Sequence, residues 1–497
     1  MKTKVTLLNM ISGFILQFFT VISGLIVPRI ILAYFGSEVN GLVTSILQFL
    51  SYISLVEGGV TSVVMANLYK PVVNNDIERI NSVLSTAKSF FRKIGLIYIL
   101  YSFVLAVVYP IVKHTSFSFK YVSILVIILS IGSVIQYMLS LTLRVLLDAN
   151  KRSYIVSFTH CGIIVLNIFL VLLSVKVFPS IHIVKLISGL LFIIQPLIFK
   201  LYISRHYNIN TKAPTDNNLI KERWNGFAIN LAAFIHGSTD VVILTLFCSD
   251  LSIVSVYNVY ALVTSGLKSL INSTTSGIVH VVGQAYAKGD NEELNSKLNL
   301  YEYIIFILVF LAYTLSSLLI TPFVLLYTHG VTDANYNQPL FGVLLSIAEA
   351  IYLLKAPHLS LAYTANKFKD VSVPAYIEAA INITISLILL NKFGLVGVAV
   401  GTICAMSYRM VFQVHFSSKI IKDRKEFSFY KKLFLFVLTT VIGVVICINI
   451  PISISNVTSW IMCAIVYAIV LVGLYFILSS LFFKNELNYL LRYLKRK

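Results

Sequence analysis

The chain has 497 residues, of which 58% are hydrophobic and only 12% are charged, and its mean hydropathy is +0.88. This composition excludes a water-soluble globular protein and indicates an integral membrane protein. The formal charge of +19 does not indicate nucleic-acid binding, because basic residues of a membrane protein usually mark its cytoplasmic loops.

Fourteen membrane-spanning helices are predicted, joined mostly by short connections. A helix needs roughly 20 apolar residues to cross the ~30 Å of hydrocarbon in a bilayer. The first span follows the basic start MKTK without a small-residue cleavage pattern, so it is predicted to be retained rather than removed as a signal peptide. The spans begin near Val5, Gly41, Phe91, Tyr121, Ser153, Ile181, Gly226, Ile253, Tyr303, Pro339, Val373, Gly394, Leu433 and Val457.

The positions of the basic residues predict the orientation of these spans. If the N-terminus is cytoplasmic, the inner segments hold 30 Lys and Arg residues and the outer segments hold six. Three more, Lys268, Lys355 and Arg409, lie within spans. The excess of basic residues on one side predicts that both termini are cytoplasmic and that most of the positive charge faces the anionic inner leaflet.

The chain resembles itself at an offset of 212 to 217 residues. The segment LLDANKRSY (146–154) aligns with AYTANKFKD (362–370), and FGSEV (35–39) aligns with FCSDL (247–251). Each match is weak alone, but together they fall at equivalent places in the order of spans. They predict two homologous lobes of six spans each.

The repeat predicts four regions of an all-α membrane protein. These are an N-terminal lobe (1–203), a cytoplasmic linker (204–225), a C-terminal lobe (226–416), and a cytoplasmic loop with two appended helices (417–497). Because six is an even number, the two lobes enter the membrane in the same orientation. Transporters built from parallel repeats bind substrate between the lobes and alternate access by rocking them.

Three segments resemble a known family. VPRIILAYFGSEVNGL (27–42), LVEGGVTSVV (55–64) and LYKPVVNNDIERIN (68–81) are similar to the start of bacterial polysaccharide-transport (Wzx-type) proteins. These are lipid-linked oligosaccharide flippases of the multidrug/oligosaccharidyl-lipid/polysaccharide (MOP) exporter superfamily. The resemblance covers about the first 430 residues, that is, the two lobes.

This resemblance implies a V-shaped, MATE-like fold in a bacterial plasma membrane. The implied substrate is an undecaprenyl-diphosphate-linked repeat unit of a capsule or other surface polysaccharide, moved from the inner to the outer leaflet. A polysaccharide polymerase and other assembly proteins are the implied partners. No short catalytic signature marks these families, so the resemblance assigns no individual site residue.

The predicted eighth span carries a lysine among hydroxyl and amide side chains, in TSGLKSLINSTTSG (264–277). A lysine at mid-bilayer costs about 2.5 to 3.5 kcal/mol on insertion scales, so it is expected to face a wet cavity or a partner. At helical spacing, Lys268, Asn272, Thr275 or Ser276, and His280 form one polar stripe.

Other predicted spans carry polar residues that are expected to face the same cavity. Ser54, Glu57 and Thr61 have helical spacing in span two, and Glu349 and Lys355 lie in span ten. Asn230, Gly237 and Asp240 share a face of span seven, while Gln17, Gly24, Pro28 and Arg29 lie in span one.

Two interpretations of the cations remain open. Arg29, Lys268 and Lys355 are predicted to bind the diphosphate of the substrate, with Asn272 donating to phosphate or sugar, because cations in a low-dielectric cavity attract phosphate strongly. Alternatively, Lys268 pairs with Glu57 or Asp240 across the lobes and holds the protein closed on one side.

The intramembrane acids and one histidine are candidates for ion coupling. Glu57, Asp240, Glu349 and His280 are predicted to tune the charge of the cavity or to hold a coupling proton or sodium ion. Arg144 and Asp148, four residues apart, are predicted to form an ordinary helix-surface pair. The five cysteines lack metal-ligand spacing, so neither a disulfide framework nor a metal site is predicted.

Competing functions remain as alternatives. A flippase for peptidoglycan lipid-linked precursors shares the fold and the diphosphate. A MATE-type drug or cation antiporter requires an acidic cavity, whereas here acids and bases are mixed. A membrane polymerase or glycosyltransferase would be expected to have a long outer loop with catalytic residues, and ATP hydrolysis would need a Walker A motif, which the sequence does not contain.

Overall fold

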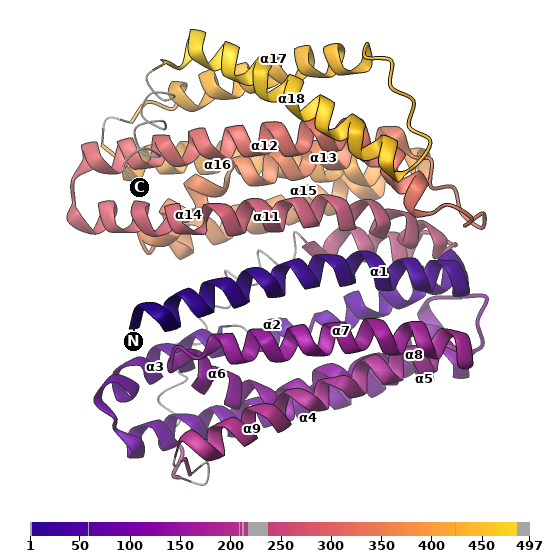
Figure 1. Cartoon of the computed structure of the whole chain (residues 1–497), viewed down its shortest axis with the longest axis vertical. Helices are drawn as coiled ribbons and strands as arrows, with labels where there is room; N and C mark the ends of the chain where they lie inside the picture. Colours follow the sequence, from indigo (N-terminus) through magenta and orange to yellow (C-terminus); the bar gives the residue numbers. More distant parts are fainter. Residues whose placement is uncertain are drawn as a thin grey trace. The chain divides into compact units, whose positions relative to one another are not determined.

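The computed structural model describes residues 2–57, 59–207, 209–210, 213–216, 237–422 and 424–484. Within these ranges all regular structure is helical, as predicted for an all-α membrane protein. The chain divides into two compact units, residues 1–255 and 256–497 (Figure 1).

Unit 1 contains the N-terminal helices. They are α1 (Lys2–Ser51), α2 (Ser54–Glu57), α3 (Val60–Asn74), α4 (Ile77–Val112), α5 (Phe119–Ile135), a π-helical turn (Gln136–Ser140), α6 (Leu141–Ala149), α7 (Ser153–Val177), α8 (Ile181–Leu190), a 3₁₀ turn (Leu191–Ile193) and α9 (Ile194–His206). The described residues Gly237–Phe247 are also helical and belong to unit 1.

Unit 2 contains the C-terminal helices. They are α11 (Ser252–Lys288), whose first turn lies in unit 1, α12 (Asn291–Tyr327), α13 (Pro339–Leu354), α14 (Ala356–Thr364), α15 (Phe368–Phe393), α16 (Leu395–Ile420), α17 (Phe427–Ile448) and α18 (Val457–Phe482).

Eleven helices of the described residues are long and apolar enough to cross a membrane, so the chain is a multi-pass membrane protein. The predicted count of fourteen also includes three segments outside these eleven. The second predicted span begins within the last part of α1, which is counted with the first span, and continues into α3. Of the seventh predicted span, the structure describes only the residues from 237 onward. α11 carries many Ser, Thr and Asn residues, which lower its hydropathy. The count of fourteen therefore stays a prediction.

The first helix bends where the first two predicted spans meet. Fifty helical residues would extend about 75 Å, more than twice the hydrocarbon thickness. Gly36 lies in a non-helical conformation (φ 82°, ψ 176°) that glycine adopts without a steric penalty. The bend falls within FGSEV, and the matching segment FCSDL contains the end of the helix Gly237–Phe247.

The second predicted span of unit 1 is interrupted, which the helical spacing of its polar residues did not predict. α2 ends at Glu57, and α3 begins at Val60 after Gly59, whose φ is 86°. The corresponding α11 of the predicted repeat is continuous over 37 residues. The two predicted repeats therefore differ where one carries Glu57 and the other carries Lys268.

The predicted repeat has a local structural counterpart in the turns that end α6 and α14. The backbone N–H of Arg152 donates to Leu147 O at 2.8 Å, and that of Lys367 donates to Ala362 O at 2.9 Å. In each turn the preceding residue has a positive φ, 60° at Lys151 and 57° at Asn366. The same helix-ending turn thus recurs at an offset of 215 residues.

The helix Gly237–Phe247 is fixed within unit 1 by buried hydrogen bonds. Thr245 donates to Ser45 at 2.9 Å, and Ser45 is 2.7 Å from the hydroxyl of Tyr109. Lys113 donates to the carbonyl oxygens of Cys248 and Ser249, just after the helix ends. The sequence assigned this helix to the second lobe. The predicted lobe boundaries stay a prediction, while the helix itself belongs to unit 1.

The appended helices α17 and α18 pack on α12 within unit 2 (Figure 1). Phe310 and Leu319 of α12 form a buried cluster with Cys447 of α17 and with residues of α18, including Leu471. The indole of Trp460 donates to Leu319 O at 3.1 Å. The pair that lies outside the predicted repeat is therefore integrated into the core of unit 2.

Candidate functional site

A charged pair lies between α11 and α13. The ammonium of Lys268 donates to the carboxylate of Glu349 at 2.9 Å, and the two side chains are 23% and 14% exposed. Pairing of Lys268 with Glu57 or Asp240 across the lobes stays a prediction, and within unit 2 its carboxylate partner is Glu349. The second oxygen of Glu349 is buried and accepts no hydrogen bond from the described residues.

The pair continues into a second, more deeply buried group of charges. Glu378 of α15 lies 3.5 Å from Lys355 and 3.4 Å from Arg409 of α16. All three side chains are less than 10% exposed. Lys355, predicted to contact substrate, thus lies at the junction of α13 and α14 with a carboxylate partner. Its predicted contact with a diphosphate remains a prediction.

Tyr352 connects the two groups. The ammonium nitrogens of Lys268 and Lys355 lie 5.0 Å and 4.5 Å from the centre of its ring. Cations at this distance are attracted to the negative face of an aromatic ring. One ring therefore stabilises both lysines, and the charges form a continuous network from α11 to α16.

The network carries an excess of positive charge. Its cations are Lys268, Lys355 and Arg409, and its acids are Glu349 and Glu378. With the lysines and the arginine protonated and the two acids ionised, the network has a formal charge of +1. The exposed fraction of its side chains falls from Lys268 to Arg409. An anion that binds near Lys268 would balance this charge, whereas an organic cation would add to the excess.

The predicted polar stripe of α11 lies on the face that the rest of unit 2 leaves uncovered. Asn272, Ser276 and His280 are exposed, whereas Thr275 is buried and donates to Ile271 O. Ser276 is therefore the exposed one of the two alternatives. The opposite face packs against α12 through apolar residues, including Ile271, Val282 and Ala285. Polar side chains in a membrane seldom face lipid, so this face is expected to border water.

Glu57 lies at the helix break of unit 1 and is held by two hydroxyl groups. It accepts hydrogen bonds from Thr61 at 2.6 Å and from Tyr137, in the π-helical turn, at 3.1 Å. Ser54, the third residue of the predicted stripe, is exposed. The arrangement presents a carboxylate with hydroxyl groups around it at an interrupted helix, which is a common setting for ion binding in transporters.

The remaining predicted site residues of unit 1 lie on α1 and on the helix Gly237–Phe247. Arg29 is half-buried in α1, one residue after Pro28, and Gln17 is half-buried further toward the N-terminus of the same helix. Asp240 is 5% exposed. Asn230 falls outside the residues that the structure describes.

A second buried charge cluster was missed by sequence reasoning. Glu302 of α12 is completely buried and contacts Arg424, Lys432 at 2.7 Å and His358 at 3.4 Å. Asn299 accepts a further hydrogen bond from Lys432 at 3.2 Å. Lys432 directly precedes the predicted span that begins near Leu433, and Glu302 precedes the one that begins near Tyr303, so the sequence did not indicate that they pair. The cluster ties the appended helix α17 to the cytoplasmic end predicted for α12.

Arg144 and Asp148 have an ordinary structural role, and the cysteines are unpaired with one another. Arg144 and Asp148 form a helix-surface pair at 3.6 Å, as predicted. All five cysteines are free thiols. Among the described residues, no group of three His, Cys, Asp or Glu side chains is arranged to hold a metal ion.

The sequence matched no protein-family model and no curated protein, but the fold matches solved transporter structures. "Lipid II flippase MurJ, inward closed conformation" aligns with a TM-score of 0.68 and 16% identity, covering 96% of this chain and 99% of that one. "Crystal structure of eukaryotic MATE transporter AtDTX14" has a TM-score of 0.59 and 13% identity, covering 87% and 98%.

A third match is the MATE multidrug transporter DinF-BH, with a TM-score of 0.59 and 17% identity, covering 86% of this chain and 96% of that one. Another MATE structure among the matches is described as a transporter of the MOP superfamily. The MurJ match leaves 4% of this chain uncovered, so it must include most of residues 417–497. The chain thus has the fold shared by MurJ and the MATE transporters.

Proposed function

We propose that this protein is a flippase. It moves undecaprenyl-diphosphate-linked repeat units of a surface polysaccharide from the inner to the outer leaflet by alternating access. The proposal rests on the fold shared with transporters, on the resemblance of the N-terminal segments to polysaccharide-transport proteins, and on the chemistry of the network around Lys268.

The observation that carries the choice of substrate is the positive excess of this network. Lys268 is its most exposed member, and its ammonium is shared between Glu349 and the ring of Tyr352. A diphosphate that enters along the polar face of α11 can replace Glu349 as the partner of Lys268. Hydrogen bonds between a charged donor and phosphate are short and strong, so this exchange binds the head group without leaving Lys268 unpaired.

The displaced carboxylate of Glu349 can couple substrate binding to the binding of a cation. Once Lys268 binds phosphate, Glu349 is an acid in a partly buried site without its partner. Such an acid favours a proton or a sodium ion. Glu349 therefore couples substrate binding to cation binding, and release of the cation restores the Lys268–Glu349 pair and expels the phosphate.

The proposal is tested in proteoliposomes with a fluorescent undecaprenyl-diphosphate oligosaccharide. Lys268→Ala and Lys268→Glu are expected to reduce flipping at least tenfold, while Lys268→Arg retains part of it because it keeps the charge. Lys369→Ala, which removes an exposed lysine at the start of α15, is the control for loss of charge. Full flipping by both Lys268→Ala and Lys268→Glu at normal protein levels would remove this network from substrate transport.

A peptidoglycan-precursor flippase is the second candidate. It is favoured by the match to a lipid II flippase over 96% of this chain, which includes most of the appended region. The two candidates are separated by supplying the same proteoliposomes with lipid II or with a lipid-linked polysaccharide repeat unit. Faster flipping of lipid II would assign the protein to the peptidoglycan precursor.

A further inference from the structure

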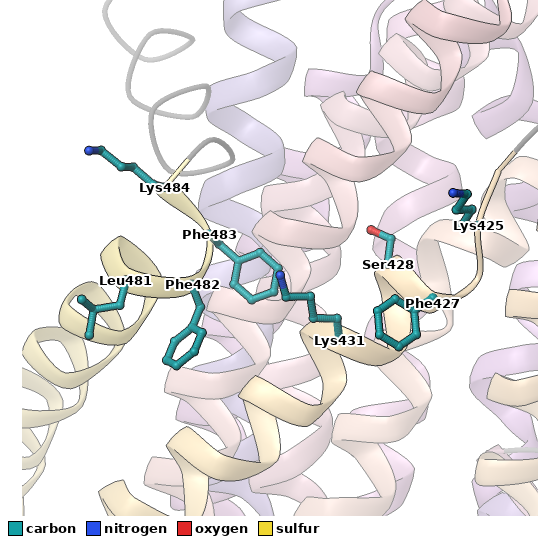
Figure 2. Close-up of a pocket in the computed structure, with 8 residues that line it drawn as sticks. All are labelled: Lys425, Phe427, Ser428, Lys431, Leu481, Phe482, Phe483 and Lys484. Atoms are coloured by element: carbon teal, nitrogen blue, oxygen red, sulfur yellow. The ribbon is translucent and has the colours of Figure 1, made fainter.

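A pocket of about 490 Å³ lies where α17 begins and α18 ends. Three lysines line it, together with Ser428 and a wall of apolar side chains. Figure 2 shows these residues, which are Lys425, Phe427, Ser428, Lys431, Leu481, Phe482, Phe483 and Lys484. All of them lie in unit 2, and none belongs to the network around Lys268.

The three lysines of this pocket have no acidic partner among the described residues. None of Lys425, Lys431 and Lys484 forms an ion pair there, and all three are exposed. The acid that follows Lys425 in the chain is Glu426, which accepts hydrogen bonds from His415 at 2.7 Å and Ser418 at 2.9 Å. The pocket therefore concentrates positive charge that the described side chains do not neutralise.

The hydrogen bonds of Glu426 favour its ionised, carboxylate form. Burial alone would raise its pKa, but the hydrogen bonds from His415 and Ser418 outweigh burial and hold the pKa of Glu426 below its ordinary value. The carboxylate is committed to α16 and is not available to the lysines of the pocket.

The apolar residues of the pocket are positioned for a membrane boundary. Phe427, Leu481 and Phe482 are 74%, 70% and 51% exposed, and they begin and end two membrane-spanning helices. Phe483 is buried and anchors the wall, and the ammonium of Lys431 lies 5.3 Å from the centre of its ring. Aromatic side chains at helix ends with lysines beside them are typical of the level of lipid head groups.

We propose that this pocket binds the phosphate of an anionic phospholipid from the surrounding leaflet. The lysines bind the head group, Ser428 donates to a phosphate oxygen, and the exposed Phe and Leu side chains contact the first methylenes of the acyl chains. Basic pockets between membrane helices bind anionic head groups in this way. The site is separate from the transported lipid and does not depend on the proposed flippase activity.

The test measures lipid retained by the full-length protein in detergent, using native mass spectrometry with phosphatidylglycerol. The triple variant Lys425→Gln, Lys431→Gln, Lys484→Gln is expected to weaken binding roughly 10- to 100-fold. The charge-preserving arginine triple variant is expected to keep it. All three lysines are exposed, so an unchanged melting temperature will show that the variants are folded.

The matched control is the triple variant Lys367→Gln, Lys369→Gln, Lys392→Gln. It removes three exposed lysines from the same unit and is expected to retain phosphatidylglycerol as the unmodified protein does. If both triple variants retain the lipid equally, the pocket does not bind it and the proposal fails.

Two competitors separate the sources of phosphate. Inorganic phosphate at millimolar concentration is expected to leave phosphatidylglycerol bound, because it lacks acyl chains; displacement by it would make the pocket a site for free anions and overturn the proposal. Undecaprenyl phosphate is expected to compete weakly. If undecaprenyl phosphate binds more tightly than phosphatidylglycerol and loses its binding in the glutamine variant, the pocket belongs to the transported lipid instead.

Discussion

At the scale of single residues, the charged side chains of unit 2 differ in how much stability the protein loses when an ion-pair partner is removed. Lys268 and Glu349 keep partial access to solvent, whereas Glu302 is completely buried between Arg424 and Lys432. A buried ion that loses its partner retains the full cost of leaving water. The exposed pair can therefore exchange partners during a transport cycle, and the buried cluster cannot.

The Lys268–Glu349 pair is tested by a double-mutant cycle. Lys268→Met leaves Glu349 unpaired and is expected to lower the free energy of unfolding by about 1–3 kcal/mol, and adding Glu349→Gln is expected to restore most of the loss. Thermal unfolding in detergent measures the four proteins. Additive losses from the two substitutions would show that the pair makes no coupled contribution.

Substitution of Glu302 is expected to destabilise the protein more than substitution of Lys268. Glu302→Gln leaves Arg424 and Lys432 buried without a counter-charge and is expected to cost about 3–5 kcal/mol of unfolding free energy. The control is Asp148→Asn, which breaks the exposed pair with Arg144 and should cost less than about 1 kcal/mol. Similar melting temperatures for both variants would contradict this account of the buried cluster.

At the scale of helices, two glycines allow α15 and α16 to approach closely. A Cβ atom at Gly401 would lie 2.2 Å from Ser386 Oγ, and one at Gly397 would lie 2.6 Å from the backbone of Leu389. Small residues four apart are the usual means by which membrane helices come into close contact. This contact also sets the spacing of Glu378 on α15 and Arg409 on α16.

Gly401→Ala is expected to separate these helices and to lower the melting temperature. The steric conflict is with the backbone N of Ser386 as well as with its side chain, so rotation of the hydroxyl cannot relieve it. Gly473→Ala in α18 is the matched control, because no atom lies within 4 Å of its added Cβ and alanine favours helix. An unchanged melting temperature for Gly401→Ala would show that the interface tolerates a wider spacing.

At the scale of the whole molecule, the distribution of basic residues predicts how the helices are oriented in the membrane. Basic residues predict that the connection between α12 and α13 is outside and that the one between α16 and α17 is inside. With the five native cysteines replaced by alanine, an impermeant thiol reagent is expected to label Thr332→Cys on intact cells. Lys422→Cys should react only after the cells are opened, and the reverse pattern would invert the predicted orientation.

Composition and periodicity predicted the helical class, the membrane location and the polar face of α11, because these depend on local sequence. They did not predict that Lys268 pairs with Glu349, since the partner of a charge depends on how helices pack. The cluster around Glu302 was missed for the same reason, and because Lys432 directly precedes a predicted span. The break at Gly59 was missed because the spacing of Ser54, Glu57 and Thr61 fits a continuous helix equally well.

The cluster around Glu302 also has a mechanical consequence. Arg424 and Lys432 attach the connecting loop and the first turns of α17 to α12, while Tyr303 and Ser479 join α12 to the end of α18. The start of α17 and the end of α18, which lie beside the lysine pocket, are therefore both bonded to the one helix α12. If α12 tilts during a conformational change, α17 and α18 are expected to move with it as a rigid body and to displace the lipid around them.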